Sequence, residues 1–146
     1  MFVKVDPEVF FYIRKLHLDA DIEASMSTPE ELEGFDCYLW DAFGGRMPYI
    51  IPYGFAIKLH VEPDKHELAS VFKDKEWPMP WAFGAGHVVS YVHQMFCMDE
   101  NGRLKSSLRL TCVGPKLRRR WEEEGFRVVE TQRHPTNNRT VYYMEL

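Results

Sequence analysis

The amino-acid sequence predicts an α/β (or α+β) fold with a mixed, mostly antiparallel sheet flanked by helices, in a single domain covering residues 1–146. Two patterns favour this fold. Apolar residues recur at the spacing of an amphipathic helix between positions 88 and 96. Further along, residues 104–113 alternate apolar and polar side chains as a strand does, and residues 126–131 and 140–146 form a predicted hairpin. A chain of 146 residues is long enough to bury one core.

The first half of the chain predicts strands with a helix between them. Residues 1–5 alternate as a short strand, and the Asp-Pro-Glu sequence that follows favours a helix from about Pro7 to His17. A second helix start at residues 27–31 is expected to open only a short helix. Aromatic-rich strands are expected on either side of the glycine turn at residues 44–48, with a further strand at residues 67–72.

The second half predicts a loop, two helices and the strands already named. Residues 77–81, Trp-Pro-Met-Pro-Trp, are expected to form an extended loop, because closely spaced prolines prevent a helix. The following helix is expected to end at Asn101-Gly102, where the glycine suits a left-handed cap. Residues 116–124 predict another helix, in which arginines and glutamates pair at i,i+4. That self-compensated charge is typical of a solvated surface.

Composition excludes some functional classes. The formal net charge of −4 gives no basic footprint for nucleic acid, although the helix at residues 116–124 and the hairpin after it together could imitate a winged helix. No apolar run approaches the ~20 residues that span a bilayer. Three scattered cysteines without paired spacing favour reduced thiols and a cytoplasmic location. We therefore expect neither nucleic acid nor a membrane as partner.

The sequence Gly84-Ala85-Gly86 precedes the strongest helical pattern and predicts a turn that receives phosphate. Glycines two residues apart let backbone N–H groups approach one point without obstruction by a Cβ atom. Free N–H groups at a helix start add a partial positive charge, which stabilises an anion. A glycine-rich turn without a ligand is the alternative.

The order of elements resembles the GNAT superfamily of N-acetyltransferases, and the motifs lie within residues 81–126. In that family a Gln/Arg-x-x-Gly-x-Gly/Ala loop holds the pyrophosphate of acetyl-CoA, and Gly84 and Gly86 keep its glycine spacing. A helix closed by Gly-Phe before a final hairpin is also similar to the family. The resemblance implies acetyl-CoA as co-substrate. Its implied binding residues are Trp81, Phe83, Gly84, Ala85, Gly86 and His87.

Three positions depart from the family's pattern. Trp81 stands where the loop usually begins with Gln or Arg, and Gly114 replaces a frequent Asn at the end of the fifth strand. Trp121 stands where the family often has the tyrosine that protonates the thiolate. An indole N–H donates a hydrogen bond but cannot serve as that acid near neutral pH.

Acyl transfer to an amine requires a base that takes a proton from the amine. Glu67 and His66 are the catalytic candidates, followed by His60, although an ordinary solvated surface residue is the simpler interpretation of each. The dense polar patch at residues 60–66 is better explained as a hydrophilic turn than as a metal site, so no metal is expected. His134 begins a His-x-Thr sequence, but the second such motif that a two-histidine phosphoesterase needs is missing.

Two functions remain open from the sequence. The first is an acyl-CoA-dependent N-acyltransferase that transfers an acetyl group to an amine substrate. The second is a catalytically degenerate protein of the same fold that acts in binding or assembly. In that case the aromatic loop from Trp77 to Phe83 would contact a protein partner.

Overall fold

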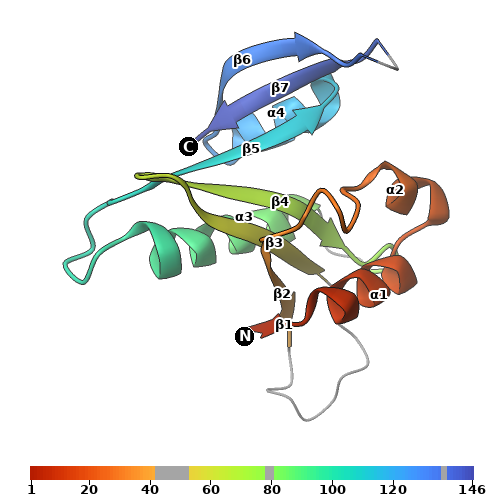
Figure 1. Cartoon of the computed structure of the whole chain (residues 1–146), viewed down its shortest axis with the longest axis horizontal. Coiled ribbons are helices and arrows are strands. Elements are labelled where there is room, and N and C mark those ends of the chain that lie inside the picture. The colour runs from red at the N-terminus through yellow and green to blue at the C-terminus, as the bar shows by residue number, and fades with distance from the viewer. Residues whose placement is uncertain (42–52, 78–80, 136–137) are drawn as a thin grey trace. The chain divides into compact units, whose positions relative to one another are not determined.

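The computed structural model describes residues 1–41, 53–77, 81–135 and 138–146, and Figure 1 labels its elements. In chain order they are β1 (Phe2–Val5), α1 (Pro7–His17), α2 (Ala20–Ser25), β2 (Asp36–Trp40), β3 (Tyr53–Glu62), β4 (Lys65–Lys73), α3 (Trp81–Val92), the π-helical turn η1 (His93–Cys97), β5 (Ser107–Val113), α4 (Pro115–Glu123), β6 (Arg127–Arg133) and β7 (Thr140–Glu145). The predicted turn at residues 44–48 lies outside the described residues, as do residues 78–80 of the predicted loop.

The strands follow the order β1-β2-β3-β4-β5-β7-β6. Strands β4 and β5 run parallel. The pairs β1–β2, β2–β3, β5–β7 and β6–β7 are antiparallel. The predicted α/β (or α+β) fold, with a mixed, mostly antiparallel sheet and flanking helices, is therefore confirmed.

The chain divides into two compact units. Unit 1 contains Met1–Lys58 and Leu68–Val88, and unit 2 contains Leu59–Glu67 and Val89–Leu146. Strands β3 and β4 and helix α3 contribute residues to both units. The single-domain organisation stays a prediction, and each unit is described by itself below.

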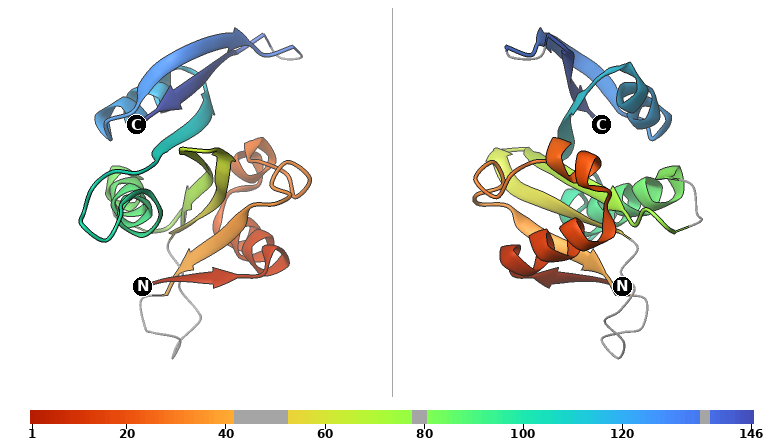
Figure 2. Two further views of the ribbon diagram at one scale, coloured as in Figure 1. Left: turned by 60° about the vertical axis from the view of Figure 1, so that its left-hand side comes forward. Right: turned by 90° about the vertical axis from the view of Figure 1, so that its right-hand side faces the viewer.

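In unit 1, helix α1 covers one face of β2, β3 and β4. Phe10 of α1 is fully buried and packs edge-on against Phe72 of β4, with the ring centroids 5.6 Å apart. Strand β2 alternates, so that Cys37 and Leu39 face this cluster while the residues between them face the opposite side. Figure 2 shows α1 and α2 on one side of these strands and the start of α3 on the other. Burial of these apolar side chains is the main stabilising contribution within the unit.

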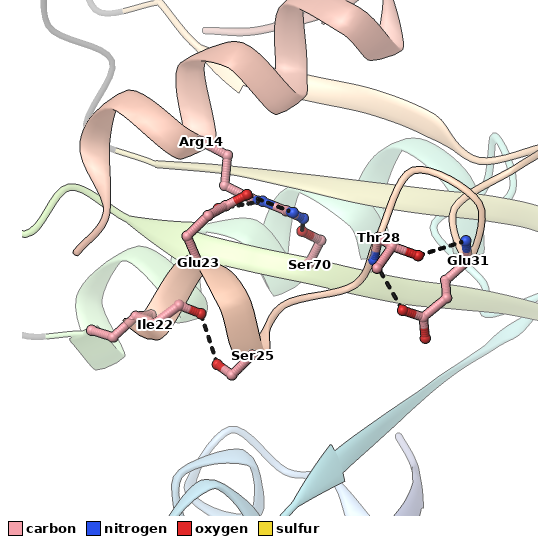
Figure 3. A network of polar contacts seen from close by, with 7 residues as sticks. All are labelled: Arg14, Ile22, Glu23, Ser25, Thr28, Glu31 and Ser70. Carbon is pink, nitrogen blue, oxygen red and sulfur yellow. Dashed lines mark hydrogen bonds and ion pairs between the residues drawn. The ribbon is translucent and has the colours of Figure 1, made fainter. Parts of the chain in front are cut away.

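A buried ion pair joins α1, α2 and β4 within unit 1 (Figure 3). The Arg14 guanidinium donates to both carboxylate oxygens of Glu23, at 2.9 and 3.0 Å, and to the Ser70 hydroxyl at 2.7 Å. Ser70 adopts a positive φ of 52° inside β4, where the alternation of buried residues is interrupted. Only 2% of Arg14 is exposed. A bidentate partner and a third acceptor together satisfy this buried cation.

In unit 2, helix α4 packs on one face of the β5–β7–β6 strands. Trp121 is buried beside Phe126, with the ring centroids 5.4 Å apart. The Arg118 guanidinium lies 5.1 Å from the centre of the Tyr142 ring, on the same face. The residues of β5 that alternate with the buried ones face away from α4. The sequence therefore predicted the order of elements in the C-terminal part correctly.

Two predicted helix starts differ from the structure. The helix expected after Gly86 begins earlier, at Trp81. Residues 27–31 form a single turn, in which the Thr28 backbone N–H donates to the Glu31 carboxylate and the Glu31 N–H donates to the Thr28 hydroxyl. These are the reciprocal bonds of a capping box. No helix follows them, because Leu32 and Phe35 turn into the core only a few residues later.

Candidate functional site

The Gly84-Ala85-Gly86 segment lies inside the first turns of α3, so the prediction of a turn ahead of the helix is wrong. Gly84 and Ala85 are buried. A Cβ atom added at Gly84 would lie 3.7 Å from both the Trp77 and the Tyr53 rings, an ordinary packing distance. Glycine costs about 1 kcal/mol inside a helix, and packing of α3 against these rings offsets that cost. The Cα of Gly84 faces the aromatic core of unit 1 and is no open cradle for a ligand.

A hydrogen bond between Tyr53 and His87 fixes the start of α3 on the sheet. The Tyr53 hydroxyl lies 2.5 Å from Nδ1 of His87. Burial raises the pKa of Tyr53 to about 12, so the phenol keeps its proton and donates to the ring nitrogen. Burial, together with the charge of the N-terminal amine, lowers the pKa of His87 below its ordinary value. Because the pKa of Tyr53 is raised and that of His87 is lowered, both side chains are neutral, and Nδ1 of His87 accepts the hydrogen bond from the phenol.

Aromatic rings surround this pair on the face of unit 1 opposite α1. The His87 ring lies 4.7 Å from the Trp40 ring and 5.3 Å from the Phe2 ring, measured between centroids. Tyr53 stacks on Trp40 and on Trp77 at 5.5 and 5.1 Å. His87 is therefore a packed side chain of the core rather than one aimed at a bound anion.

The backbone at the start of α3 fits an anion better than the glycines do. The first four N–H groups of an α-helix, counted from the N-cap, have no partner within the helix, and in α3 three of them belong to residues 81–83. They add the positive end of the helix dipole. The backbone N–H groups at the start of α3 therefore suit a phosphate, whereas Gly84 allows α3 to pack closely against the Trp77 and Tyr53 rings.

The segment that leads to α3 is fastened to the end of α1. Asp74 bonds the His17 ring, and the Lys75 backbone N–H donates to the His17 carbonyl oxygen at 3.0 Å. The Lys73 ammonium donates to the carbonyl oxygens of Asp74 and Trp77, at 3.1 and 3.0 Å. Burial acts to raise the pKa of Asp74, but the bonds from His17 and from the Glu76 backbone outweigh it, so this pKa lies below its usual value.

In unit 2, His66 uses both of its ring nitrogens in structural hydrogen bonds. Nδ1 accepts from the His60 backbone N–H at 3.0 Å, so Nε2 carries the hydrogen and donates to the Phe96 carbonyl oxygen at 3.0 Å. Only 2% of the residue is exposed. This arrangement leaves no nitrogen to take a proton from a substrate. His60 contributes its backbone to the same contact, with a positive φ of 56°.

Glu67 points to the opposite face of β4, among charged neighbours on the open side of unit 2. In the strand register Glu67 pairs with Arg109, which pairs with Glu145. Nε of Arg109 lies 3.4 Å from Glu67, and Nη1 donates to Glu62 at 3.0 Å. The Lys65 ammonium lies 2.8 Å from the Glu145 carboxylate and offsets its negative charge. Glu67 is thus partly exposed but shares Arg109 with Glu62.

This open face bounds a cavity of about 360 Å³. Its lining combines carboxylates with Arg109, Thr111 and Tyr143 and with apolar atoms at its base. The lining residues are Glu62, Glu67, Arg109, Leu110, Thr111, Val129, Glu130, Tyr143, Met144 and Glu145. Such a lining suits a cationic group, because the carboxylates attract an ammonium. A carboxylate within hydrogen-bond reach of that ammonium can also accept its proton.

The structure therefore separates the predicted site residues into two groups. Residues 81–87 belong to unit 1, whereas His66 and Glu67 belong to unit 2. Sequence reasoning missed Tyr53 and Arg109, which contact His87 and Glu67. Neither had a signal in the sequence, because both contacts depend on which strands and helices become neighbours.

Two of the three positions that depart from the family's motif, Gly114 and Trp121, have structural roles. Trp121 is 5% exposed and packs on Phe126. Gly114 has a positive φ of 89° and donates its N–H to the Thr140 carbonyl oxygen at 3.0 Å. With a ψ of 154°, this conformation lies in a region that is essentially restricted to glycine, so the family's Asn would be strained at this position. These residues shape unit 2 rather than supply an acid.

Other reactive groups are confined to the interior. Burial raises the pKa of the thiols of Cys37, Cys97 and Cys112 to about 11 each, which makes them poor nucleophiles. Outside residues 42–52, 78–80 and 136–137, no cluster of three or more His, Cys, Asp or Glu residues could hold a metal ion. Within the same described ranges, no helix is both long and apolar enough to cross a membrane.

The fold is that of the GNAT acetyltransferases, as solved structures show. A protein from Desulfovibrio desulfuricans assigned to the GNAT family is 11% identical, with a TM-score of 0.65 over 100% of this chain and 97% of that chain. No protein-family model matches the sequence, and neither does a curated protein sequence. The likeness is therefore one of fold.

Two further structures show which ligands other proteins of this fold bind. Spermidine N-acetyltransferase from Vibrio cholerae, in complex with CoA and spermine, is 12% identical, with a TM-score of 0.65 over 100% of this chain and 94% of that one. A chain of the NatC complex, bound to Gag peptide and CoA, is 14% identical, with a TM-score of 0.59 over 100% of this chain and 96% of that one.

Proposed function

We propose that the protein is an acyl-CoA-dependent N-acyltransferase that transfers an acetyl group to an amine. The observation that carries the proposal is the similarity of the whole chain to acetyltransferase structures that hold CoA. A fold alone does not establish an activity, so the residues at the start of α3 and on the open face of unit 2 provide the second line of support.

The backbone N–H groups of residues 81–83, at the start of α3, are the part of this chain suited to the pyrophosphate of acetyl-CoA. Bound acetyl-CoA would supply the acetyl group as an activated thioester. Trp81, Phe83, Gly84, Ala85, Gly86 and His87 remain the proposed cofactor-binding segment. Within it we assign binding to the backbone, because the Cα of Gly84 and the ring of His87 both pack inward.

Of the two proposed catalytic residues, Glu67 suits the role of the base, whereas His66 suits a structural role next to it. Glu67 lines the acidic cavity, where a protonated amine would be attracted by the surrounding carboxylates. His66 holds the turn at His60 and the end of η1 through its two hydrogen bonds. We expect Glu67 to hold the proton that the amine loses when its nitrogen attacks.

The binding part of the proposal is tested by titration calorimetry with CoA, acetyl-CoA and pantetheine. Pantetheine lacks the pyrophosphate, so we expect the two larger ligands to bind and pantetheine to bind at least about tenfold more weakly. Ala82→Pro removes one N–H at the start of α3, where a proline is tolerated, and should weaken CoA binding. Ala82→Ser keeps that N–H and is the matched control. Absence of CoA binding at millimolar concentration would refute the proposal.

The second candidate is a degenerate protein of the same fold that binds or assembles without catalysis. The burial of Trp121 and the hydrogen bonds of His66 favour it, because neither residue can act as an acid or base there. In this case CoA thiol release from acetyl-CoA would not exceed the buffer rate with any amine. The segment from Trp77 to Phe83 remains the proposed protein interface for this candidate, and a cytoplasmic location is proposed for both.

A further inference from the structure

Unit 1 contains an open groove that lies far in sequence from the proposed cofactor-binding and catalytic residues. Its volume is about 600 Å³, within the range of known ligand pockets. Phe11, Leu32 and Phe35 provide an apolar floor, and the exposed prolines Pro7 and Pro29 stand at its sides. The groove thus offers apolar surface between the start of α1 and the segment before β2.

Carboxylates dominate the rim of this groove. Glu8, Glu30 and Glu33 line it, all three are exposed, and no cation lines it with them. Among the described residues, none of the three forms an ion pair. Nearby, Lys4 pairs with Asp36 at 3.3 Å, and the Lys58 ammonium lies over the Phe35 ring at 5.8 Å.

The groove is held in shape by the backbone of its own segment. Leu32 donates its N–H to the Thr28 carbonyl oxygen at 3.1 Å, and Phe35 donates to the Leu32 carbonyl oxygen at 3.0 Å. Gly34 between them has a φ of 84°, a conformation that favours glycine. Little reorganisation would be needed for binding, and a preformed site binds more tightly than one that must be ordered.

We propose that this groove docks a segment of a partner protein in which an aromatic or aliphatic side chain lies next to lysine or arginine. The apolar side chain fills the floor, and the neighbouring cations reach the three rim carboxylates. Charge complementarity decides the occupant, because an unpaired acidic rim repels acidic segments and nucleic acid. The proposal does not depend on acetyl transfer, since every lining residue lies in unit 1 and none belongs to the proposed catalytic group.

The test is fluorescence anisotropy of the full chain with a labelled peptide, Gly-Lys-Lys-Phe-Leu-Lys-Lys-Gly. One comparison peptide replaces the lysines with glutamates, and another replaces Phe-Leu with Ser-Ser. The groove variant is Glu8→Gln, Glu30→Gln and Glu33→Gln combined. The control variant, Asp21→Asn with Glu100→Gln and Glu123→Gln, removes the same charge from exposed positions elsewhere.

We expect the lysine peptide to bind the wild-type chain and both comparison peptides to bind at least about tenfold more weakly. The groove variant should lose about tenfold in affinity, since each exposed charge pair contributes a factor of about two. The control variant should stay within about twofold of wild type. Equal binding by both variants, equal binding of the Ser-Ser peptide, or no binding at 1 mM peptide (a limit of about 4 kcal/mol) would overturn the proposal. Sedimentation could instead show a dimer for the wild type and the control variant and a monomer for the groove variant. That result would assign the groove to a second copy of this chain and overturn the proposal.

Discussion

The start of α3 in unit 1 and the open face of β4 and β5 in unit 2 both contain residues with a predicted role in chemistry, but the two regions are built in opposite ways. Around His87 the polar atoms are hydrogen-bonded and enclosed by aromatic rings. Around Glu67 they are charged, partly exposed and grouped beside a cavity. Glycines and histidines in a sequence therefore mark packing as readily as ligand binding, and only the surroundings separate the two.

The largest expected effect compares two glycines of unit 1. A Cβ at Gly54 would lie 2.7 Å from the Tyr38 carbonyl oxygen and 2.9 Å from the Phe72 ring, whereas a Cβ at Gly84 would lie no closer than 3.7 Å to the described side chains. Gly54→Ala should lower the free energy of unfolding by about 3 kcal/mol or more. Gly84→Ala should change it by less than about 1 kcal/mol. Urea denaturation measures both, and equal effects would contradict the packing assigned to α3.

The next effect compares the neighbours His66 and Glu67. His66→Ala removes a buried ring and leaves the His60 N–H without its acceptor, so we expect a loss of about 2–3 kcal/mol. Glu67→Gln should cost less than about 1 kcal/mol, because its ion pair is partly exposed.

Enzyme kinetics test the proposed role of Glu67 as the base. If the acyltransferase proposal holds, Glu67→Gln should lower kcat about 100-fold or more with unchanged affinity for acetyl-CoA. Glu130→Gln, which removes another carboxylate of the same cavity, is the control. A fully active Glu67→Gln enzyme would mean that the base lies elsewhere.

A smaller effect concerns Tyr53. Tyr53→Phe keeps the stacking on Trp40 and Trp77 but removes the hydrogen bond to His87, so we expect a loss of about 1 kcal/mol. A loss close to zero would show that water replaces the phenol at Nδ1. His87→Phe combined with Tyr53→Phe completes a double-mutant cycle, and a coupling energy near zero would remove this bond from the description.

The smallest effect is the pH dependence of stability. The pKa of His87 is lowered in the folded protein by burial, and that of His93 is lowered by the same cause. The unfolded chain then binds protons more readily, so the free energy of unfolding should fall as the pH drops below about 6.5. Asp74, whose pKa is also lowered, should add to the loss at more acidic pH. Thermal unfolding from pH 8 to 5 checks the direction, and removal of both histidines should flatten it.

Local patterns predicted β5 and α4 of unit 2 well, because alternation from Ser107 to Val113 and the Gly-Pro start of α4 are properties of neighbouring residues. The expected helix end at Asn101-Gly102 is wrong, since α3 ends at Val92 and the π-helical turn η1 ends at Cys97. The start of α3 was misplaced because the cost of glycine in a helix is local, while the rings that offset it come from Tyr53 and Trp77. The environment of Glu67 was likewise beyond the sequence, since Arg109 reaches it only through the parallel pairing of β4 and β5.

The buried Arg14 has a consequence for the motions of helix α2. That helix has six residues and none of them is buried, so its attachment depends largely on the two bonds from Arg14 to Glu23. A lysine at position 14 could not donate to Glu23 and Ser70 in the same planar geometry. We therefore expect backbone amides of α2 to exchange with deuterium much faster in Arg14→Lys than in the wild type, while those of β2 keep their protection. Helix α2 would then open and close as a separate, low-energy unit of the native state.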